Sequence, residues 1–146
     1  MSGFRYKWMG GSTLWTDIKE NNTEFYVSFS KALVSHDFVD PGKWFILRLG
    51  RNVFMIMHEE DFEKYKESVE EERGRGADFF PAVVKENEEN YFFCWKREFM
   101  KEPVDDMNSW SFVRGDKNFF YFYPHARRDW KTRGILKRFG IIHNHA

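Results

Sequence analysis

The stretches WFILRLGRNVFMIMH, at residues 44–58, and WSFVRGDKNFFYFYPH, at residues 110–125, follow the same pattern. Each begins with a Trp, continues through mostly apolar residues to an Arg, turns near a Gly and an Asn, and follows an aromatic or Met-rich run to a His. Strand-forming runs on either side of a Gly-containing turn are typical of β-hairpins. The sequence therefore predicts two similar hairpins, and we interpret Arg114-Gly115-Asp116 as a turn rather than an adhesion motif.

Further strands are predicted on both sides of the first hairpin. Alternating residues predict strands at 4–8 and 24–30, with Val34 as an alternative end of the second, and residues 91–100 form a third strong strand-like run. A short strand is expected at 79–84, where Pro81 restricts it to a sheet edge or a bulge. Residues 14–18 instead carry apolar side chains at helical spacing.

Two helices are predicted from apolar spacing. Phe62, Tyr65 and Val69 lie at i, i+3 and i+7, which predicts an amphipathic acidic helix at about 59–72. A short basic helix is expected at about 128–139, with Thr132 as a helix-starting residue and Gly140 after its end. Residues 141–146 are expected to be a flexible tail.

The order of these elements predicts the fold class. Hairpins and single strands precede and follow the acidic helix, which favours an antiparallel sheet with helices on one face. We therefore predict an α+β fold, with residues 1–146 forming one domain, as expected for a chain of 146 residues.

Composition limits the class of protein. The chain holds 17 Phe, 6 Trp and 6 Tyr, yet 32% of its residues are charged and its mean hydropathy is −0.68, which indicates an aromatic core within a polar shell. No apolar run is long enough to cross a membrane, and residues 1–11 lack the apolar region of a signal peptide. A single cysteine, Cys94, agrees with a reducing compartment and is interpreted as a small core residue. The expected location is cytoplasmic, without a membrane partner.

The formal net charge of zero conceals a separation of charge along the chain. Residues 58–72 hold eight acids and two lysines, a net charge of −6, and residues 125–146 hold six basic residues and one Asp, a net charge of +5 with His neutral. The first hypothesis is nucleic-acid binding, with cations neutralising phosphates and exposed rings stacking on bases. Its candidate residues are Tyr121, Tyr123, His125, Arg127, Arg128, Trp130, Lys131, Arg133, Lys137 and Arg138.

Protein binding is the alternative hypothesis. A regulator or inhibitor of another protein can use the same separated acidic and basic faces, and two copies of the chain can pair them in a homodimer. Pairing of the two faces within one molecule would weaken the nucleic-acid hypothesis.

Enzyme activity ranks third. A small nuclease, metal-dependent or metal-independent, would need general acid and base groups such as His125, His143 and His145, and no spacing shows that these meet. The acids after His58 are interpreted as a helix start, where carboxylates face the positive end of the helix dipole. The sequence therefore assigns no catalytic residue, cofactor or metal ligand.

Overall fold

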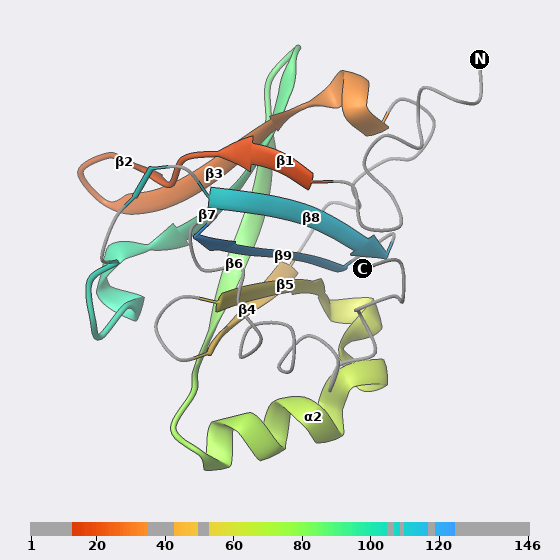
Figure 1. Ribbon diagram of the computed structural model, residues 1–146, viewed down its shortest axis with the longest axis vertical. Helices are drawn as coiled ribbons and strands as arrows, with labels where there is room; N and C mark the ends of the chain where they lie inside the picture. The colour runs from red at the N-terminus through yellow and green to blue at the C-terminus, as the bar shows by residue number, and fades with distance from the viewer. Residues whose placement is uncertain are drawn as a thin grey trace.

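The computed structural model describes residues 13–34, 43–49, 53–104, 107–108, 110–116 and 119–124. In these residues nine strands form one antiparallel sheet, in the order β1-β8-β9-β5-β4-β6-β7-β3-β2, accompanied by one α-helix, α2 (Figure 1). The strands are β1 (Thr13–Thr16), β2 (Lys19–Glu20), β3 (Glu24–Ser30), β4 (Lys43–Leu49), β5 (Val53–His58), β6 (Asp78–Glu86), β7 (Asn90–Lys96), β8 (Trp110–Asp116) and β9 (Phe119–Pro124). The helices are α2 (Phe62–Gly74) and the short 3-10 segments η2 (Lys31–Val34), η3 (Glu59–Asp61) and η4 (Arg97–Phe99).

Both predicted hairpins are confirmed. In the first, β4 pairs with β5 from Trp44 opposite His58 to Leu49 opposite Val53. In the second, β8 pairs with β9, with an irregular register between Arg114 and Asp116. The prediction that Arg114-Gly115-Asp116 is the turn is wrong, because these residues belong to β8 and Asp116 pairs with Phe119. Because β5 also pairs with β9, the two hairpins lie side by side and form four consecutive strands of the sheet.

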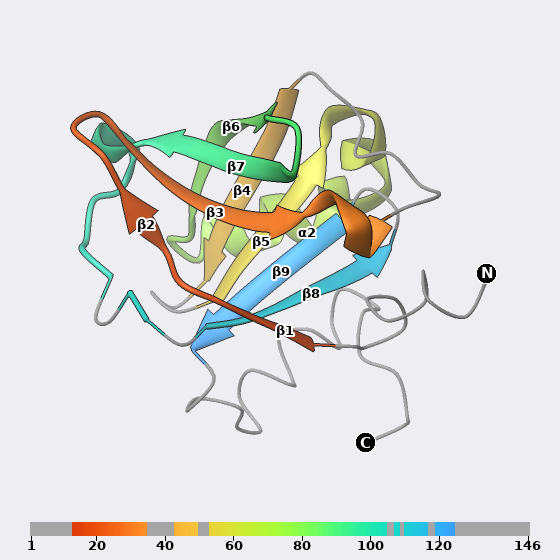
Figure 2. The ribbon, with the colours of Figure 1, turned by 90° about the horizontal axis from the view of Figure 1, so that it is seen from above.

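The sheet curves until its two ends approach each other. β1 and β2 are the two edge strands of the sheet, yet only residues 17–18 separate them in the chain. Figure 2 shows this chain passing from β1 through β2 into β3 across the opening of the curved sheet. The Phe29 ring of β3 lies 5.7 Å from Phe112 of β8 and 5.6 Å from Phe120 of β9, although five strands separate β8 from β3 in the sheet order. The architecture is therefore an antiparallel half-barrel.

The concave side of the half-barrel is filled by aromatic side chains. Side chains alternate between the two faces of a strand, so every second residue points inward. Phe54 stacks on Phe122 with ring centroids 4.7 Å apart and nearly parallel planes, and Trp44 packs edge-on against Phe93 at 4.9 Å. Sixteen buried residues form this inner core.

A second buried cluster lies on the convex side, beneath α2. Tyr65 of the helix lies 4.5 Å from Phe119 of β9, and Val69 is fully buried in the same cluster. The acidic amphipathic helix predicted at 59–72 is thus confirmed, although its first three residues form η3 and the α-helix continues to Gly74. The sheet and its one described α-helix agree with the α+β class. Neither α2 nor the described 3-10 segments are long and apolar enough to cross a membrane.

Several predicted elements need correction. Residues 14–18 are not helical, because residues 13–16 pair with β8 and so short a segment cannot recover the cost of starting a helix. The strand predicted at 24–30 is confirmed but ends there, because η2 follows it. The strand predicted at 91–100 ends at Lys96, where η4 begins.

Pro81 lies in a longer and more central strand than predicted. β6 spans nine residues and has neighbours on both sides. Pro81 itself pairs only with β4, opposite Phe45, because the pairing of β6 with β7 begins at Val83. The constraint on proline therefore applies locally, to the part of β6 that has a single neighbour.

Other predicted elements lie outside the described residues. These are the strand at 4–8, the basic helix at about 128–139 and the tail at 141–146.

Packing of α2 on the convex side gives a testable stability difference. We expect Tyr65→Ala to lower the free energy of unfolding by about 3 kcal/mol, because it removes a nearly buried ring from contact with Phe119. Glu67→Ala, at an exposed position of the same helix, should change it by less than about 0.5 kcal/mol. Urea unfolding followed by circular dichroism measures both. Equal effects would contradict the placement of the helix.

Candidate functional site

The part of the convex side that α2 does not cover carries an exposed mixed surface. Because Val27 and Phe29 of β3, Phe93 and Trp95 of β7, and Ala82 of β6 belong to the inner core, their sequence neighbours point outward. We call this surface the open outer face. It consists of Pro81, Val83 and Lys85 of β6, Phe92, Cys94 and Lys96 of β7, and Glu24, Tyr26 and Ser28 of β3.

The centre of the open outer face is apolar. Val83 is 42% exposed, the largest exposure of any large hydrophobic residue in the described part of the chain. It is in register with Cys94 and, through Cys94, with Tyr26. The half-buried Tyr26 ring lies edge-on to Phe92 at 6.0 Å. Three apolar side chains from three strands therefore share one exposed surface.

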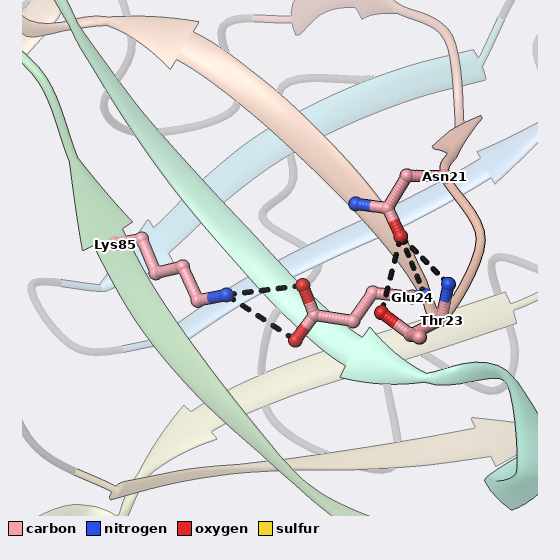
Figure 3. Close-up of polar contacts among 4 residues, drawn as sticks. All are labelled: Asn21, Thr23, Glu24 and Lys85. Carbon is pink, nitrogen blue, oxygen red and sulfur yellow. Dashed lines mark hydrogen bonds and ion pairs between the residues drawn. The ribbon is translucent and has the colours of Figure 1, made fainter.

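An ion pair between Lys85 and Glu24 crosses this surface (Figure 3). The ammonium of Lys85, on β6, donates hydrogen bonds of 3.0 and 3.3 Å to the two carboxylate oxygens of Glu24, on β3. The hydrogen bond to Glu24 raises the pKa of Lys85 above its ordinary value of 10.5, and burial opposes this only in part. Cys94 lies on β7, between the two strands that carry the pair.

The turn before β3 holds Glu24 in position. The Asn21 side-chain oxygen accepts hydrogen bonds from the backbone N–H groups of Thr23, at 2.9 Å, and Glu24, at 2.8 Å (Figure 3). An asparagine that bonds to the backbone two and three residues later is a common way of fixing a turn. The carboxylate of Glu24 is therefore presented from a defined backbone.

Cys94 is a buried thiol whose surroundings disfavour the reactive thiolate form. Its side chain is buried, and burial is the largest cause that raises its pKa from 9.0 to about 11, followed by the negative charge of Glu24. The nearby Lys85 cation lowers the pKa, but by less. The interpretation of Cys94 as a packed residue rather than a nucleophile agrees with its burial.

A polar groove of about 450 Å³ adjoins the open outer face and shares Glu24 and Lys96 with it. Arg97 forms one side of the groove: its backbone N–H donates to the Thr23 carbonyl at 3.0 Å, its guanidinium lies 4.8 Å from the Phe25 ring centroid, and it forms an ion pair with Glu20. The groove is lined by Asn22, Thr23, Glu24, Lys96, Arg97 and Glu98. Its lining therefore offers cations, carboxylates and uncharged polar groups together.

The structure places two of the predicted nucleic-acid-binding residues in the interior. Tyr121 and Tyr123 are 5% and 7% exposed and belong to the buried cluster that includes Tyr65 and Val69 of α2. The expectation that these rings are exposed for base stacking is therefore wrong, because the helix covers the side of β9 to which they point. The other predicted residues lie outside the described residues: His125, Arg127, Arg128, Trp130, Lys131, Arg133, Lys137 and Arg138.

His58 has a structural role at the start of η3. Its Nδ1 accepts a hydrogen bond of 3.1 Å from the backbone N–H of Glu60, and its ring lies edge-on to Trp44 at 5.1 Å. The interpretation of this region as a helix start agrees with that geometry. Within the ranges that the structure describes, no group of three His, Cys, Asp or Glu side chains lies close enough to hold a metal ion.

Sequence analysis missed the open outer face and the groove. The alternation in β3 placed Tyr26 and Ser28 on the face opposite Val27, but which face a helix covers depends on strand order. The groove joins two segments about 70 residues apart through the pairing of Glu24 with Lys96, a contact that no local pattern reveals. Comparison of the chain with models of protein families, with curated proteins and with solved structures finds no match.

The raised pKa of Cys94 predicts slow alkylation. At pH 8, burial and a pKa of about 11 should make the native chain react with iodoacetamide at least about 100-fold more slowly than the urea-unfolded chain. The native rate should rise about tenfold per pH unit until the pH reaches that pKa. Mass spectrometry gives the rates, and Cys94→Ala is the unlabelled control because the chain has no other cysteine. A native rate that levels off near pH 9 would contradict the assignment.

Proposed function

We propose that this chain is a binding protein that recognises another protein through its open outer face and the adjoining groove. The observation that carries the proposal is the exposed Val83 beside the half-buried rings of Tyr26 and Phe92, on a convex surface that α2 leaves uncovered. Aromatic residues are enriched in the centres of protein interfaces, and an exposed apolar patch with a polar rim is typical of such sites.

The charges around the patch define the chemistry of the partner. The Lys85–Glu24 pair crosses the patch and presents one ammonium and one carboxylate. The pair is partly exposed and contributes little stability of its own, about 0 to 1 kcal/mol. Its use in an interface is selection of a partner with both signs of charge around an apolar centre.

The groove extends this surface beyond the apolar centre. Lys96 and Glu98 are exposed at its rim and present one ammonium and one carboxylate. A partner segment that places an apolar side chain over Val83 and carries polar groups into the groove fits both features. Such binding supports the role of a regulator or inhibitor that acts by occupying a partner protein.

The open outer face gives a direct test. With the tagged chain as bait in an extract of its source cells, we expect a reproducible protein partner that Val83→Glu and Tyr26→Ala each weaken at least about tenfold. The reason is that Val83→Glu places a charge in the apolar centre and Tyr26→Ala removes the packed ring. Titration of the purified partner by calorimetry gives the affinities.

The control variant for this test is Glu67→Gln, on the exposed surface of α2. It should leave the affinity unchanged. A partner lost with Glu67→Gln but retained with Val83→Glu would contradict the proposal and favour the acidic helix. Light scattering shows whether the partner is a second copy of the chain, the homodimer expected from the charge pattern.

Nucleic-acid binding is a second candidate function, supported by the cluster of basic residues between Arg127 and Arg138. Six cations against one acid within 22 residues can neutralise phosphates without any base stacking. The burial of Tyr121 and Tyr123 removes two of its proposed stacking residues, which is why it ranks below protein binding.

A salt titration tests this second candidate. Fluorescence anisotropy with single-stranded and double-stranded oligonucleotides should show affinity that falls steeply with salt, and Arg127→Gln with Arg128→Gln should reduce the slope by about 2. Lys64→Gln with Lys66→Gln, on α2, is the charge-matched control and should have no effect. Absence of binding at low salt would exclude the candidate. Incubation of the same oligonucleotides with Mg²⁺ or a chelator reports any nuclease activity.

A further inference from the structure

One end of the half-barrel is covered by an irregular segment rather than by a strand. Residues 97–104, which we call the strap, begin with η4 and continue without strand pairing. Phe99 of the strap lies 6.0 Å from Phe80 of the inner core. The apolar side chains that pack here on the inner core are each only partly buried, and they are Phe25, Phe99, Met100, Val104 and Met107.

A buried arginine holds the strap in place. The Arg48 side chain is 3% exposed and points from β4 into this end of the half-barrel. Its Nη1 donates a hydrogen bond of 2.5 Å to the Glu102 carbonyl, and its Nη2 donates one of 3.1 Å to the Pro103 carbonyl. The guanidinium also lies 5.1 Å from the Phe54 ring centroid. Beyond Arg97, whose backbone N–H bonds to the Thr23 carbonyl, the strap is thus held by the Arg48 side chain and by apolar contacts rather than by strand pairing.

Beneath the strap lies a buried polar group without a partner. Trp95 is 1% exposed, and its indole Nε1 is the only buried side-chain nitrogen or oxygen in the described residues that finds no hydrogen-bond partner. Its ring is surrounded by Phe25 at 6.1 Å, Phe54 at 6.0 Å and Phe122 at 6.1 Å. None of these rings can accept a conventional hydrogen bond, so the donor remains unsatisfied at a cost to folding.

We propose that this end of the half-barrel binds a small, flat, apolar molecule that carries one neutral acceptor oxygen, and that Trp95 Nε1 donates to that oxygen. The neighbouring rings select a flat apolar body, because aromatic rings pack best against planar surfaces. The acceptor is neutral because a buried carboxylate would need a cation, and the Arg48 guanidinium already bonds to the strap carbonyls.

The strap supplies the entrance to this site. Lifting residues 97–104 away from the half-barrel exposes Phe25 and the edge of the inner core. Met100 and Met107, at the strap and just beyond it, have flexible side chains that can repack around a ligand. This ligand site is on the concave side of the sheet and is distinct from the open outer face on the convex side, although Arg97 belongs both to the strap and to the groove.

The test compares two probes of nearly equal shape, 2-acetylnaphthalene and 2-ethylnaphthalene, of which only the first carries an acceptor oxygen. The full chain is labelled with ¹⁵N in its Trp side chains, and Trp95→Phe identifies the Trp95 indole signal. We expect 2-acetylnaphthalene to move that signal downfield and to bind about tenfold more tightly than 2-ethylnaphthalene. In Trp95→Phe the two probes should bind equally.

Two further variants distinguish binding at the proposed site from nonspecific hydrophobic binding. Arg48→Met should speed association of 2-acetylnaphthalene, because it releases the strap carbonyls. Val83→Glu, on the convex side, should leave binding of both probes unchanged, whatever its effect on a protein partner. If Trp95→Phe does not fold, exchange of the Trp95 indole proton in the wild-type chain provides the same information, and 2-acetylnaphthalene should slow it more than 2-ethylnaphthalene.

Three results would overturn the proposal. The first is an unperturbed Trp95 indole signal at saturating probe. The second is equal affinity of the two probes for the wild-type chain, and the third is a preference for 2-acetylnaphthalene that persists in Trp95→Phe. A water molecule that permanently satisfies the indole would give the first result, because the probe would then gain nothing from its oxygen.

Discussion

The curvature of the sheet depends on aromatic rings that meet across its concave side. A nine-stranded antiparallel sheet without curvature would leave the inner face of every strand exposed to water. Phe29 of β3 instead packs on Phe112 and Phe120, from strands far away in the sheet order. Rings of this size span the interior of the half-barrel, so burial of apolar surface and closure of the sheet are achieved by the same contacts. The short link between β1 and β2 follows from that closure, because it joins strands that curvature has brought together.

The strands of the curved sheet differ in whether one or both of their faces are covered. In β5 every residue is buried, and in β9 all but Pro124 are buried, because the inner core lies on one side and α2 on the other. β6 alternates instead: Phe80 and Ala82 are buried, whereas Pro81 and Val83 are exposed. One helix of thirteen residues covers only part of a nine-stranded convex side. The open outer face is the part of the convex side that α2 leaves uncovered, and the half-buried rings of Tyr26 and Phe92 distinguish it from a purely polar surface.

How much of the fold and of the candidate site the sequence predicts depends on how far apart in sequence the interacting residues are. The hairpins and α2 depend on residues close in sequence, and their apolar spacing predicted them, although the turn of the second hairpin lies after Asp116 rather than at Arg114 to Asp116. The strand at residues 13–16 could not be predicted, because it owes its conformation to β8, about 100 residues away. The same dependence on distant residues explains why the sequence did not predict the open outer face or the groove. Burial of Tyr121 follows from where α2 packs, and the groove follows from the register of Glu24 with Lys96, neither of which leaves a local signal.

Arg97 connects the two surfaces that carry the proposals. It is the first residue of the strap and also lines the groove. Its backbone bonds to Thr23 and its guanidinium covers Phe25, a ring that in turn stacks on Trp95. If the strap remains lifted while the proposed ligand occupies the site at Trp95, Arg97 leaves its present position in the groove. By thermodynamic linkage, a protein partner that holds Arg97 in its present position must weaken ligand binding by the same factor by which the ligand weakens the partner. Two binding sites on opposite sides of one sheet would then compete through a single residue without sharing any surface.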